Sequence, residues 1–301
     1  MRVFRRLIKP VAVLSMAAVL GLSLAACNGD GVAGNPSGTP AMSGQITVIT
    51  REDGSGTRGA FVEIVDITEG GNDNITMEAV VAPGTSVVMT NVAENQLAIG
   101  YASTGVALGD SRVRALSIGG VEPTVENMLD GTYVIQRPFI IGYNTTAGLG
   151  ALAQDFVDFI FSAQGQEVVA GRGYVPFAAD GAPQYTPRRL SGNIVVNGSS
   201  SVYSLMQHLS EAYRDLNPNV RVDIHGAGTG HGIGAVRDGL ADIAMSSRDL
   251  RESELEFLSP LTIAIDGIAV IVHPSNTIGG LTIEQVRSIF LGEVQRWEDA
   301  R

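Results

Sequence analysis

The 301-residue sequence contains a single cysteine and a single lysine, and each scarcity excludes a class of protein. One cysteine cannot form an internal disulfide, so a disulfide-stapled fold and a paired-thiol redox site are both excluded. The lysine is Lys9, close to the N-terminus. A P-loop requires a lysine in its Gly-Lys-Ser/Thr turn, so the rest of the chain cannot contain this nucleotide-binding loop.

Other site motifs are missing as well. The glycine run at 226–234 never reaches the Gly-x-Gly-x-x-Gly register of a dinucleotide site, and no Gly-x-Ser-x-Gly nucleophile elbow occurs. None of the histidines has metal-ligand spacing; they are His208, His225, His231 and His273. We therefore expect no cofactor and no metal.

Basic residues are few relative to acidic ones. The chain has 20 Lys and Arg against 31 Asp and Glu, for a formal net charge of −11. Four of the basic residues lie among the first nine positions, which leaves the remainder still more acidic. Nucleic-acid backbones require a basic footprint, so we expect no nucleic-acid partner. A small anion remains compatible, because short-range donors in a dry cleft outweigh distant, screened charge.

The N-terminus has the pattern of a secretory signal. Basic residues precede an apolar run at 11–22, and Leu-Ala-Ala then leads into Cys27, which resembles a bacterial lipobox. We expect a signal peptide over 1–26, lipid attachment to Cys27 and a flexible Gly/Pro/Ser-rich tether over 27–44. A buried structural cysteine is the alternative, which the position of Cys27 disfavours. The protein would then be anchored by lipid at the outer face of the cytoplasmic membrane.

After residue 44, hydrophobic periodicity alternates between that of strands and that of helices. The runs at 46–50, 75–81, 96–101, 193–196, 220–224 and 262–272 are predicted strands, and 85–93, 149–163 and 202–216 are predicted helices. Polar residues at 178–191 indicate a linker between two such segments. Alternating strands and helices predict an α/β fold.

One octet, 51–58, is placed to bind an anion. It lies between a predicted strand at 46–50 and a predicted helix at 59–65. Free backbone N–H groups at a helix start favour negative charge, and small residues let an anion approach them. Ser55 and Thr57 add hydroxyls, and Arg51 adds a planar cation suited to a tetrahedral oxyanion. A capped helix with a surface arginine is the alternative interpretation.

The same order of strand, glycine-hydroxyl turn and helix occurs twice more, at 198–201 and 226–234. Three copies in one chain could converge on a single tetrahedral ligand, although glycine-rich turns are common in α/β folds. Asp266 is the only acidic residue in the apolar run at 262–272. It either caps a turn or accepts a proton from a ligand such as hydrogen phosphate, which fully ionised sulfate could not supply.

These residues resemble the phosphate-binding lipoproteins of bacterial phosphate ABC importers. The segments that carry the resemblance are Arg51-Glu-Asp-Gly-Ser-Gly-Thr-Arg-Gly-Ala-Phe, Ala98-Ile-Gly-Tyr, Gly173-Tyr-Val-Pro-Phe, Asn197-Gly-Ser-Ser-Ser-Val, Gly226-Ala-Gly-Thr-Gly, Ala241-Asp-Ile-Ala-Met-Ser-Ser-Arg-Asp-Leu, Ile265-Asp-Gly-Ile-Ala-Val and Ile289-Phe-Leu-Gly. The resemblance implies a two-lobed periplasmic-binding-protein fold of type II that closes on phosphate.

By the same resemblance, the implied ligand contacts are Arg51, Ser55, Gly56, Thr57, Ser200, Ser201, Thr229 and Ser247. Some members have an aspartate where Ser247 stands, so here the acceptor role would have to fall to another residue, for which Asp266 is the candidate. The resemblance also implies partners: inorganic phosphate, and the permease and ATPase subunits of an ABC importer.

The order of the segments differs from that of the family. The family's second half precedes its first half here, which we interpret as a circular permutation. Lobe two would combine 45–135 with 276–301, lobe one would span 136–275, and 178–191 would join the family's usual C- and N-termini. A fragment of a tandem or swapped assembly is the alternative. The permuted chain is expected to be a monomer that closes about a hinge near 136–138 and 273–276.

We therefore expect a phosphate receptor that makes and breaks no bonds. Two alternatives stay open at this point. One is a receptor for another oxyanion, such as sulfate or molybdate. The other is a secreted phosphatase or hydrolase that uses Ser55 or Ser200, although no base is evident beside either serine.

Overall fold

A computed structural model describes residues 42–69, 72–177 and 181–300. All of these belong to one unit, Thr39–Arg301. The predicted signal peptide, Cys27 and the tether up to residue 41 lie outside the described residues.

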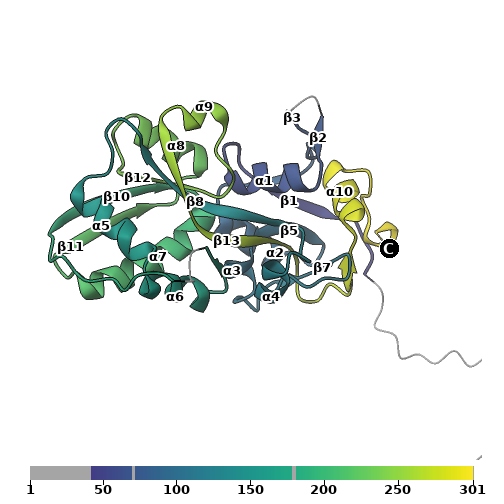
Figure 1. Cartoon of the computed structure of the whole chain (residues 1–301). Coiled ribbons are helices and arrows are strands. Elements are labelled where there is room, and N and C mark those ends of the chain that lie inside the picture. The colour runs from purple at the N-terminus through teal and green to yellow at the C-terminus, as the bar shows by residue number, and fades with distance from the viewer. Residues whose placement is uncertain (1–41, 70–71, 178–180, 301) are drawn as a thin grey trace, which may run out of the picture. The chain divides into compact units, whose positions relative to one another are not determined.

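A mixed ten-stranded sheet runs through the unit (Figure 1). In spatial order its main strands are β11 (Val220–His225), β10 (Gly192–Gly198), β12 (Ile243–Ser246), β8 (Gln136–Asn144), β13 (Leu258–Val272), β5 (Ala98–Ser103), β1 (Thr47–Arg51) and β4 (Val80–Ala82), while β6 (Arg114–Ala115) and β9 (Val175–Pro176) pair with β13. The outer strands at each end pair in parallel, and β8 and β13 are antiparallel to their neighbours.

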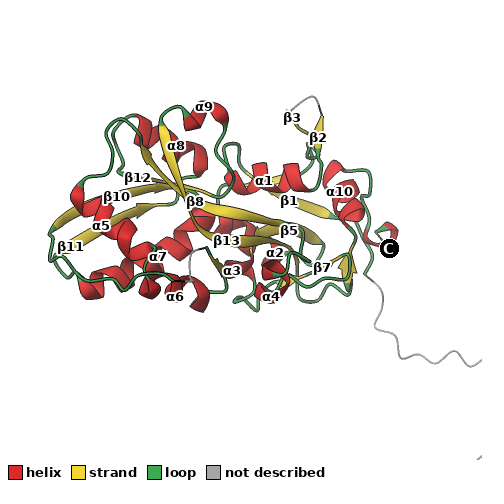
Figure 2. Cartoon of the chain, in the orientation of Figure 1, coloured by secondary structure: helices red, strands yellow, loops and turns green. Residues whose placement is uncertain are grey.

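Helices cover both faces of this sheet (Figure 2). They are α1 (Gly56–Ile64), α2 (Thr85–Glu94), α3 (Thr104–Ala107), α4 (Val125–Leu129), α5 (Ala151–Ile160), α6 (Ala163–Gly171), α7 (Ser200–Leu216), α8 (Thr229–Arg237), α9 (Glu252–Leu255) and α10 (Ile283–Leu291). A 3-10 turn spans Trp297–Asp299, and two small ribbons pair β7 (Ser117–Ile118) with β14 (Gly280–Leu281) and β2 (Thr68–Glu69) with β3 (Asn72–Asp73).

The strand β13 connects two hydrophobic cores. Its residues 258–267 pair with β8, and its residues 268–272 pair with β5. One core contains Phe139, Phe156, Leu205 and Tyr213, and the other contains residues from both ends of the described chain, such as Ile46 and Trp297. The strand β13 passes from the first core to the second at 266–268. This point lies before the expected hinge segment 273–276, because Ile268, Val270 and Val272 already pack in the second core.

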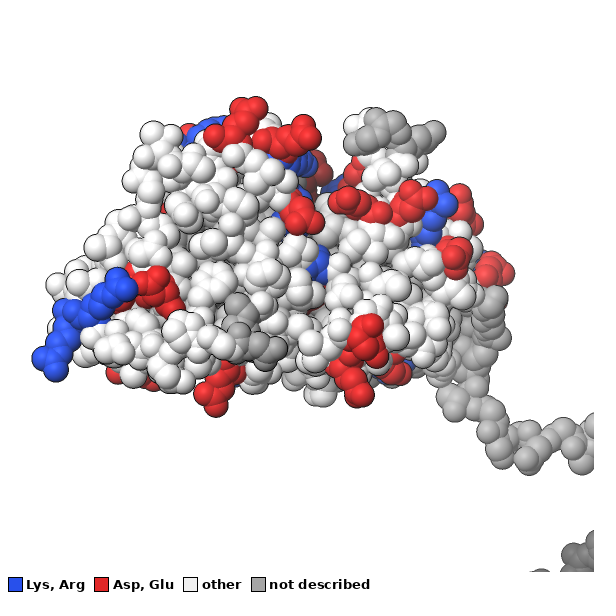
Figure 3. All heavy atoms as spheres, in the orientation of Figure 1, with Lys and Arg blue, Asp and Glu red and all other residues white. Residues whose placement is uncertain are grey.

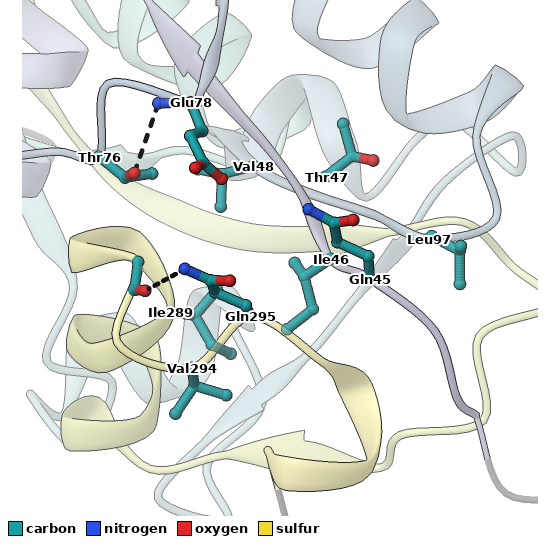
Figure 4. Close-up of a pocket in the computed structure, with 11 residues that line it drawn as sticks. Gln45, Ile46, Thr47, Val48, Thr76, Glu78, Leu97, Ile289, Val294 and Gln295 are labelled. Atoms are coloured by element: carbon teal, nitrogen blue, oxygen red, sulfur yellow. Dashed lines mark hydrogen bonds between the residues drawn. The ribbon is translucent and has the colours of Figure 1, made fainter.

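The two ends of the described chain lie side by side. The amide of Ile46 donates to the carbonyl of Gln295 at 2.8 Å, and the amide of Trp297 donates to the carbonyl of Gly44 at 3.0 Å. A pocket of about 410 Å³ lies at this junction. Figure 4 shows its lining side chains, which come from β1, such as Val48, and from the chain near α10, such as Val294. Residues 45–65 and 281–300 therefore complete one core together.

The segment predicted as a linker is held against α5 and α6. The Tyr185 hydroxyl donates to Asp155 at 2.7 Å, and its amide donates to the side-chain oxygen of Gln164 at 2.9 Å. Arg188 forms an ion pair with Asp158 at 2.7 Å. Polar composition indicated a connection here, but the buried tyrosine fixes its course.

Several element boundaries differ from the predicted ones. Helix α1 begins at Gly56 and not at 59, because the Ser55 hydroxyl accepts from the Arg58 amide at 3.3 Å and caps the helix three residues earlier. The expected strand over 75–81 is reduced to β4, Val80–Ala82. The expected strand over 262–272 begins four residues earlier, at Leu258, where it is still paired with β8.

We expect Trp297→Ala to lower the free energy of unfolding by about 3–5 kcal/mol, since the indole is fully buried in the core that the two chain ends share. Circular dichroism in urea measures this, with the exposed Leu240→Ala as the control. The unfolding midpoint should not depend on protein concentration, because the core lies within one chain. A midpoint that rises with concentration would instead indicate a swapped assembly.

Candidate anion-binding site

Four helices begin around one set of buried hydroxyls. The helices α1, α7 and α8 start at the three predicted glycine-hydroxyl turns, and α2 is the fourth. Each helix follows a strand of the sheet or the turn after it. The first N–H groups of a helix have no intrahelical partner and carry partial positive charge, so a cluster of helix starts favours an anion.

The turns place their hydroxyls by capping. Ser199 caps α7 by accepting from the amides of Ser201 and Val202 at 3.2 and 3.4 Å. Gly198, which has a φ of +144°, makes this turn possible, since a Cβ there would collide with the backbone of β12 at Met245. With the turn held in this way, the hydroxyls of Ser200 and Ser201 are available to contact Arg51 and Thr57, respectively.

Hydroxyls from distant parts of the chain meet directly. Thr57 of α1 lies 2.8 Å from the Ser201 hydroxyl and 3.5 Å from that of Ser247. The Ser199 hydroxyl donates to Ser247 at 2.8 Å, and the Ser247 amide donates to the Thr229 hydroxyl at 3.4 Å. All five are almost fully buried. The three predicted turns thus converge on one hydroxyl cluster, which we define as Thr57, Thr85, Ser199, Ser200, Ser201, Thr229 and Ser247.

Arg51 lies at the edge of this cluster. Its Nη2 donates to Ser200 at 3.0 Å, and its Nη1 donates to Thr85 at 3.3 Å. Its Nε and Nη2 also donate to the Glu52 carboxylate, at 2.8 and 2.6 Å. Arg51 is 2% exposed, so the carboxylate compensates a charge that is almost completely buried.

Tyr101 holds the strand before this octet in place. Its hydroxyl lies 2.8 Å from that of Thr50 and accepts from the Arg51 amide at 3.2 Å. Its ring stacks on Phe61 of α1, with centroids 4.1 Å apart. Burial raises the pKa of the Tyr101 hydroxyl to about 12, so it stays neutral at physiological pH. The octet is therefore fixed from both its strand and its helix.

Gly56 allows the turn at the start of α1 to lie close to Thr229 and Ser247. A Cβ at this position would collide with the hydroxyl of Thr229 and would lie 2.7 Å from that of Ser247. Nearby, the Gly230 amide donates to the Gly54 carbonyl at 3.1 Å. A side chain at position 56 would push the turns apart, so glycine is required for the observed contact. Ser55 is buried and caps α1, but it makes no hydrogen bond to the cluster among the described residues.

The carboxylate of Asp266 makes hydrogen bonds other than the ligand contact that was expected of it. One of its oxygens accepts from Ser103 and Thr104 at 2.8 and 3.1 Å, and the other accepts from Arg137 at 3.1 Å. No hydrogen bond among the described residues joins it to the hydroxyl cluster. The geometry therefore does not favour Asp266 as an acceptor for a ligand proton, because both of its oxygens already accept hydrogen bonds from neighbouring side chains.

Thr85 belongs to the cluster and was not predicted. It is 5% exposed, and its hydroxyl lies 3.3 Å from that of Ser200 and 3.1 Å from that of Ser201. Its amide, at the start of α2, donates to Ser200 at 3.3 Å. The Pro-Gly-Thr turn that precedes a helix at 83–85 was the signal that could have identified it.

The hydrogen-bond partners of the cluster, among the described residues, are hydroxyls, backbone groups and Arg51. Among the described residues, no histidine or carboxylate side chain hydrogen-bonds one of its hydroxyls, so no base is in place to activate a serine. The described part of the chain also contains no cluster of three or more metal-ligating side chains. The face in Figure 3 shows scattered acidic and basic groups without a continuous basic patch.

Comparison with known proteins identifies the family. The family described as "PBP superfamily domain" matches residues 36–164 and 183–301. Phosphate-binding protein PstS 2 of Streptococcus pneumoniae TIGR4 is 40% identical over 294 residues, which covers 96% of this chain and 98% of the relative. Its counterpart in Streptococcus agalactiae 2603 V/R is 38% identical over 299 residues, which covers 97% and 98%.

A solved structure is also similar. The crystal structure of a phosphate-binding protein of a phosphate ABC transporter from S. pneumoniae TIGR4 matches with a TM-score of 0.68 and 42% identity. The match covers 86% of this chain and all of that one. The predicted α/β periplasmic-binding-protein fold is thereby confirmed. The chain belongs to the PBP superfamily and, within it, to the family of PstS phosphate-binding proteins.

Proposed function

We propose that this protein is an extracytoplasmic receptor that captures inorganic phosphate and delivers it to an ABC importer. The observation that carries the proposal is the convergence of Arg51 and the hydroxyl cluster from both halves of the unit. Relatives that match nearly the full chain are phosphate-binding proteins. The receptor makes no chemical change to its ligand.

Phosphate would replace the hydroxyl–hydroxyl contacts. Each serine and threonine hydroxyl can rotate and donate to an oxyanion, and Arg51 can offer two N–H groups in one plane. The helix starts add backbone N–H groups in a site that is shielded from water. Because Thr57 and Ser201 lie on different halves, an anion bound between them would hold the two halves together.

The proposed contacts are Arg51, Gly56, Thr57, Ser200, Ser201, Thr229 and Ser247, with Thr85 as an addition and Ser55 as the α1 cap. The structure supports this set through the hydrogen bonds of the cluster. Asp266 is not retained as a ligand contact, since its two oxygens are already engaged by three side chains.

We infer further that the chain is circularly permuted relative to other phosphate-binding proteins, in a segment order that it shares with the PstS 2 relatives that match it over nearly their whole length. The adjacent chain ends and the docked segment 181–191 support this inference, since they are the two junctions that a permutation requires. The family matches in two separate segments that flank residues 165–182, which overlap the start of the proposed junction at 178–191. The proposed lobes, 45–135 with 276–301 and 136–275, follow the two hydrophobic cores, except that Val175, Ile268, Val270 and Val272 pack in the core of the first of them.

A lipid on Cys27 would hold the receptor at the membrane. Within the described part of the chain, no helix has the length and apolar character needed to cross a bilayer. We expect the protein in the membrane fraction of the host to carry a diacylglyceryl group on Cys27, and Cys27→Ser to be released into the medium. Intact-mass spectrometry of both forms tests this; an unmodified Cys27 would contradict it.

We expect Arg51→Ala to weaken phosphate binding by about a hundredfold, because two charge-assisted hydrogen bonds are lost and Glu52 is left unpaired. Isothermal titration with phosphate measures the change. Arg221→Ala, which removes an exposed arginine from β11, is the matched control and should bind like the wild type. Failure of the folded wild-type protein to bind phosphate would refute the proposed function.

Sulfate should compete with phosphate more effectively than in a site that contains a free carboxylate. The nearby acids are engaged: Asp266 by Arg137 and two hydroxyls, and Glu52 by Arg51. A fully ionised anion therefore meets no unpaired negative charge. In competition titrations at pH 8, we expect sulfate to bind within about a hundredfold of phosphate. Discrimination above about ten-thousandfold would mean that an acceptor turns toward the ligand.

A further inference from the structure

The ion pair between Arg137 and Asp266 lies where the sheet passes from one core to the other. Arg137 is the second residue of β8, and Asp266 stands opposite it on β13. Two residues later, at Ile268, β13 has already changed partner and pairs with Ser103 of β5. The pair thus lies on the two strands that any relative motion of the proposed lobes must bend.

The pair is completely buried. The side chains of Arg137 and Asp266 are 1% and 0% exposed, and they approach to 3.1 Å. Burial lowers the pKa of the Arg137 guanidinium, and the nearby Arg51 lowers it further. Burial raises the pKa of the Asp266 carboxyl, while Arg137 acts in the opposite direction. Each charge is thus tolerated mainly because the other is present.

The pair is connected to the hydroxyl cluster on one side only. Arg137 Nη1 donates to the carbonyl of Ser247 at 3.2 Å, and the Ser247 hydroxyl belongs to the cluster. Asp266, on the far side, is held by Ser103 and Thr104. Arg137 therefore stands between the proposed anion and Asp266, as a second buried cation behind the site.

Both cations of the site are matched by a carboxylate. Arg51 is paired with Glu52, and Arg137 is paired with Asp266. The charges of these four groups sum to zero, so the strength of anion binding depends on how completely each carboxylate cancels its arginine.

We propose that the Arg137–Asp266 pair sets the affinity for the anion: Arg137 attracts it from behind Ser247, and Asp266 attenuates that attraction. The pair is thus a positioning and charge-balancing element and not a ligand contact. This inference rests on the proposed function, since it concerns the same anion site. Asp266 can act in this way although both of its oxygens are already hydrogen-bonded, because a negative charge acts on the anion without direct contact.

The two single substitutions should act in opposite directions. Asp266→Asn leaves Arg137 uncompensated, and we expect phosphate to bind about tenfold more tightly. Arg137→Met leaves the buried carboxylate uncompensated, and we expect phosphate to bind about tenfold more weakly. The double variant Arg137→Met/Asp266→Leu removes both charges and should bind within about threefold of the wild type.

The control is the other aspartate that is fully buried among the described residues. Asp155 lies in the core of the predicted lobe one and accepts from Tyr185 and Tyr213. Asp155→Asn should lower stability without changing phosphate affinity by more than about threefold. This control separates a general loss of stability from a change in the field at the site. If Asp266→Asn does not fold, Asp266→Ser removes the same charge, leaves an oxygen for Ser103 and carries the same expectation.

Isothermal titration of each folded variant with inorganic phosphate decides the matter. Tighter binding by Asp266→Asn, weaker binding by Arg137→Met and near-wild-type binding by the double variant support the proposal. Weaker binding by all three, or changes no larger than that of Asp155→Asn, would overturn it. If the wild-type protein itself does not bind phosphate, the proposed function fails first, so the two failures are distinguishable.

Discussion

The direct contact between hydroxyls on opposite halves of the unit is the interaction on which the site depends. Thr57 is the second residue of α1 and Ser201 is the second residue of α7, yet their hydroxyls lie 2.8 Å apart although the residues are 144 positions apart in the sequence. Buried hydroxyls need partners, so in this arrangement they satisfy one another. A tetrahedral anion can accept hydrogen bonds from the same hydroxyls. The place where the two halves meet is therefore also the proposed binding site. Gly56 permits it, since any side chain there would separate the turns.

Local pairing of the buried charges explains how an acidic protein can hold an anion. Each buried arginine near the cluster has its own carboxylate: Arg51 has Glu52, and Arg137 has Asp266. The attraction left for a ligand therefore comes largely from hydroxyl dipoles and from the N–H groups at the helix starts. Such short-range groups are insensitive to the net charge of −11, because distant charges are screened by solvent and salt.

Two residues show where sequence reasoning stopped. Thr85 was missed because its turn, Pro-Gly-Thr, carries one hydroxyl and follows a short strand, so it looked like an ordinary helix start. Asp266 was identified as an unusual acid in an apolar strand, but its partner was not. Arg137 lies 129 positions away, and only the antiparallel register of β8 and β13 brings the two together. Cross-strand pairs of this kind have no local signature.

The sequence by itself determined the local structural features. These are the strands, the capped helix starts, the glycines at the turns and the hydroxyls that follow them. These depend on hydrogen bonds and apolar periodicity that act over a few residues, so a short window contains all the information. Only the tertiary structure decided which turns meet, that α2 joins them, and that Asp266 pairs with Arg137. Those outcomes depend on sheet order and core packing between residues far apart in the chain, and a local pattern cannot encode them.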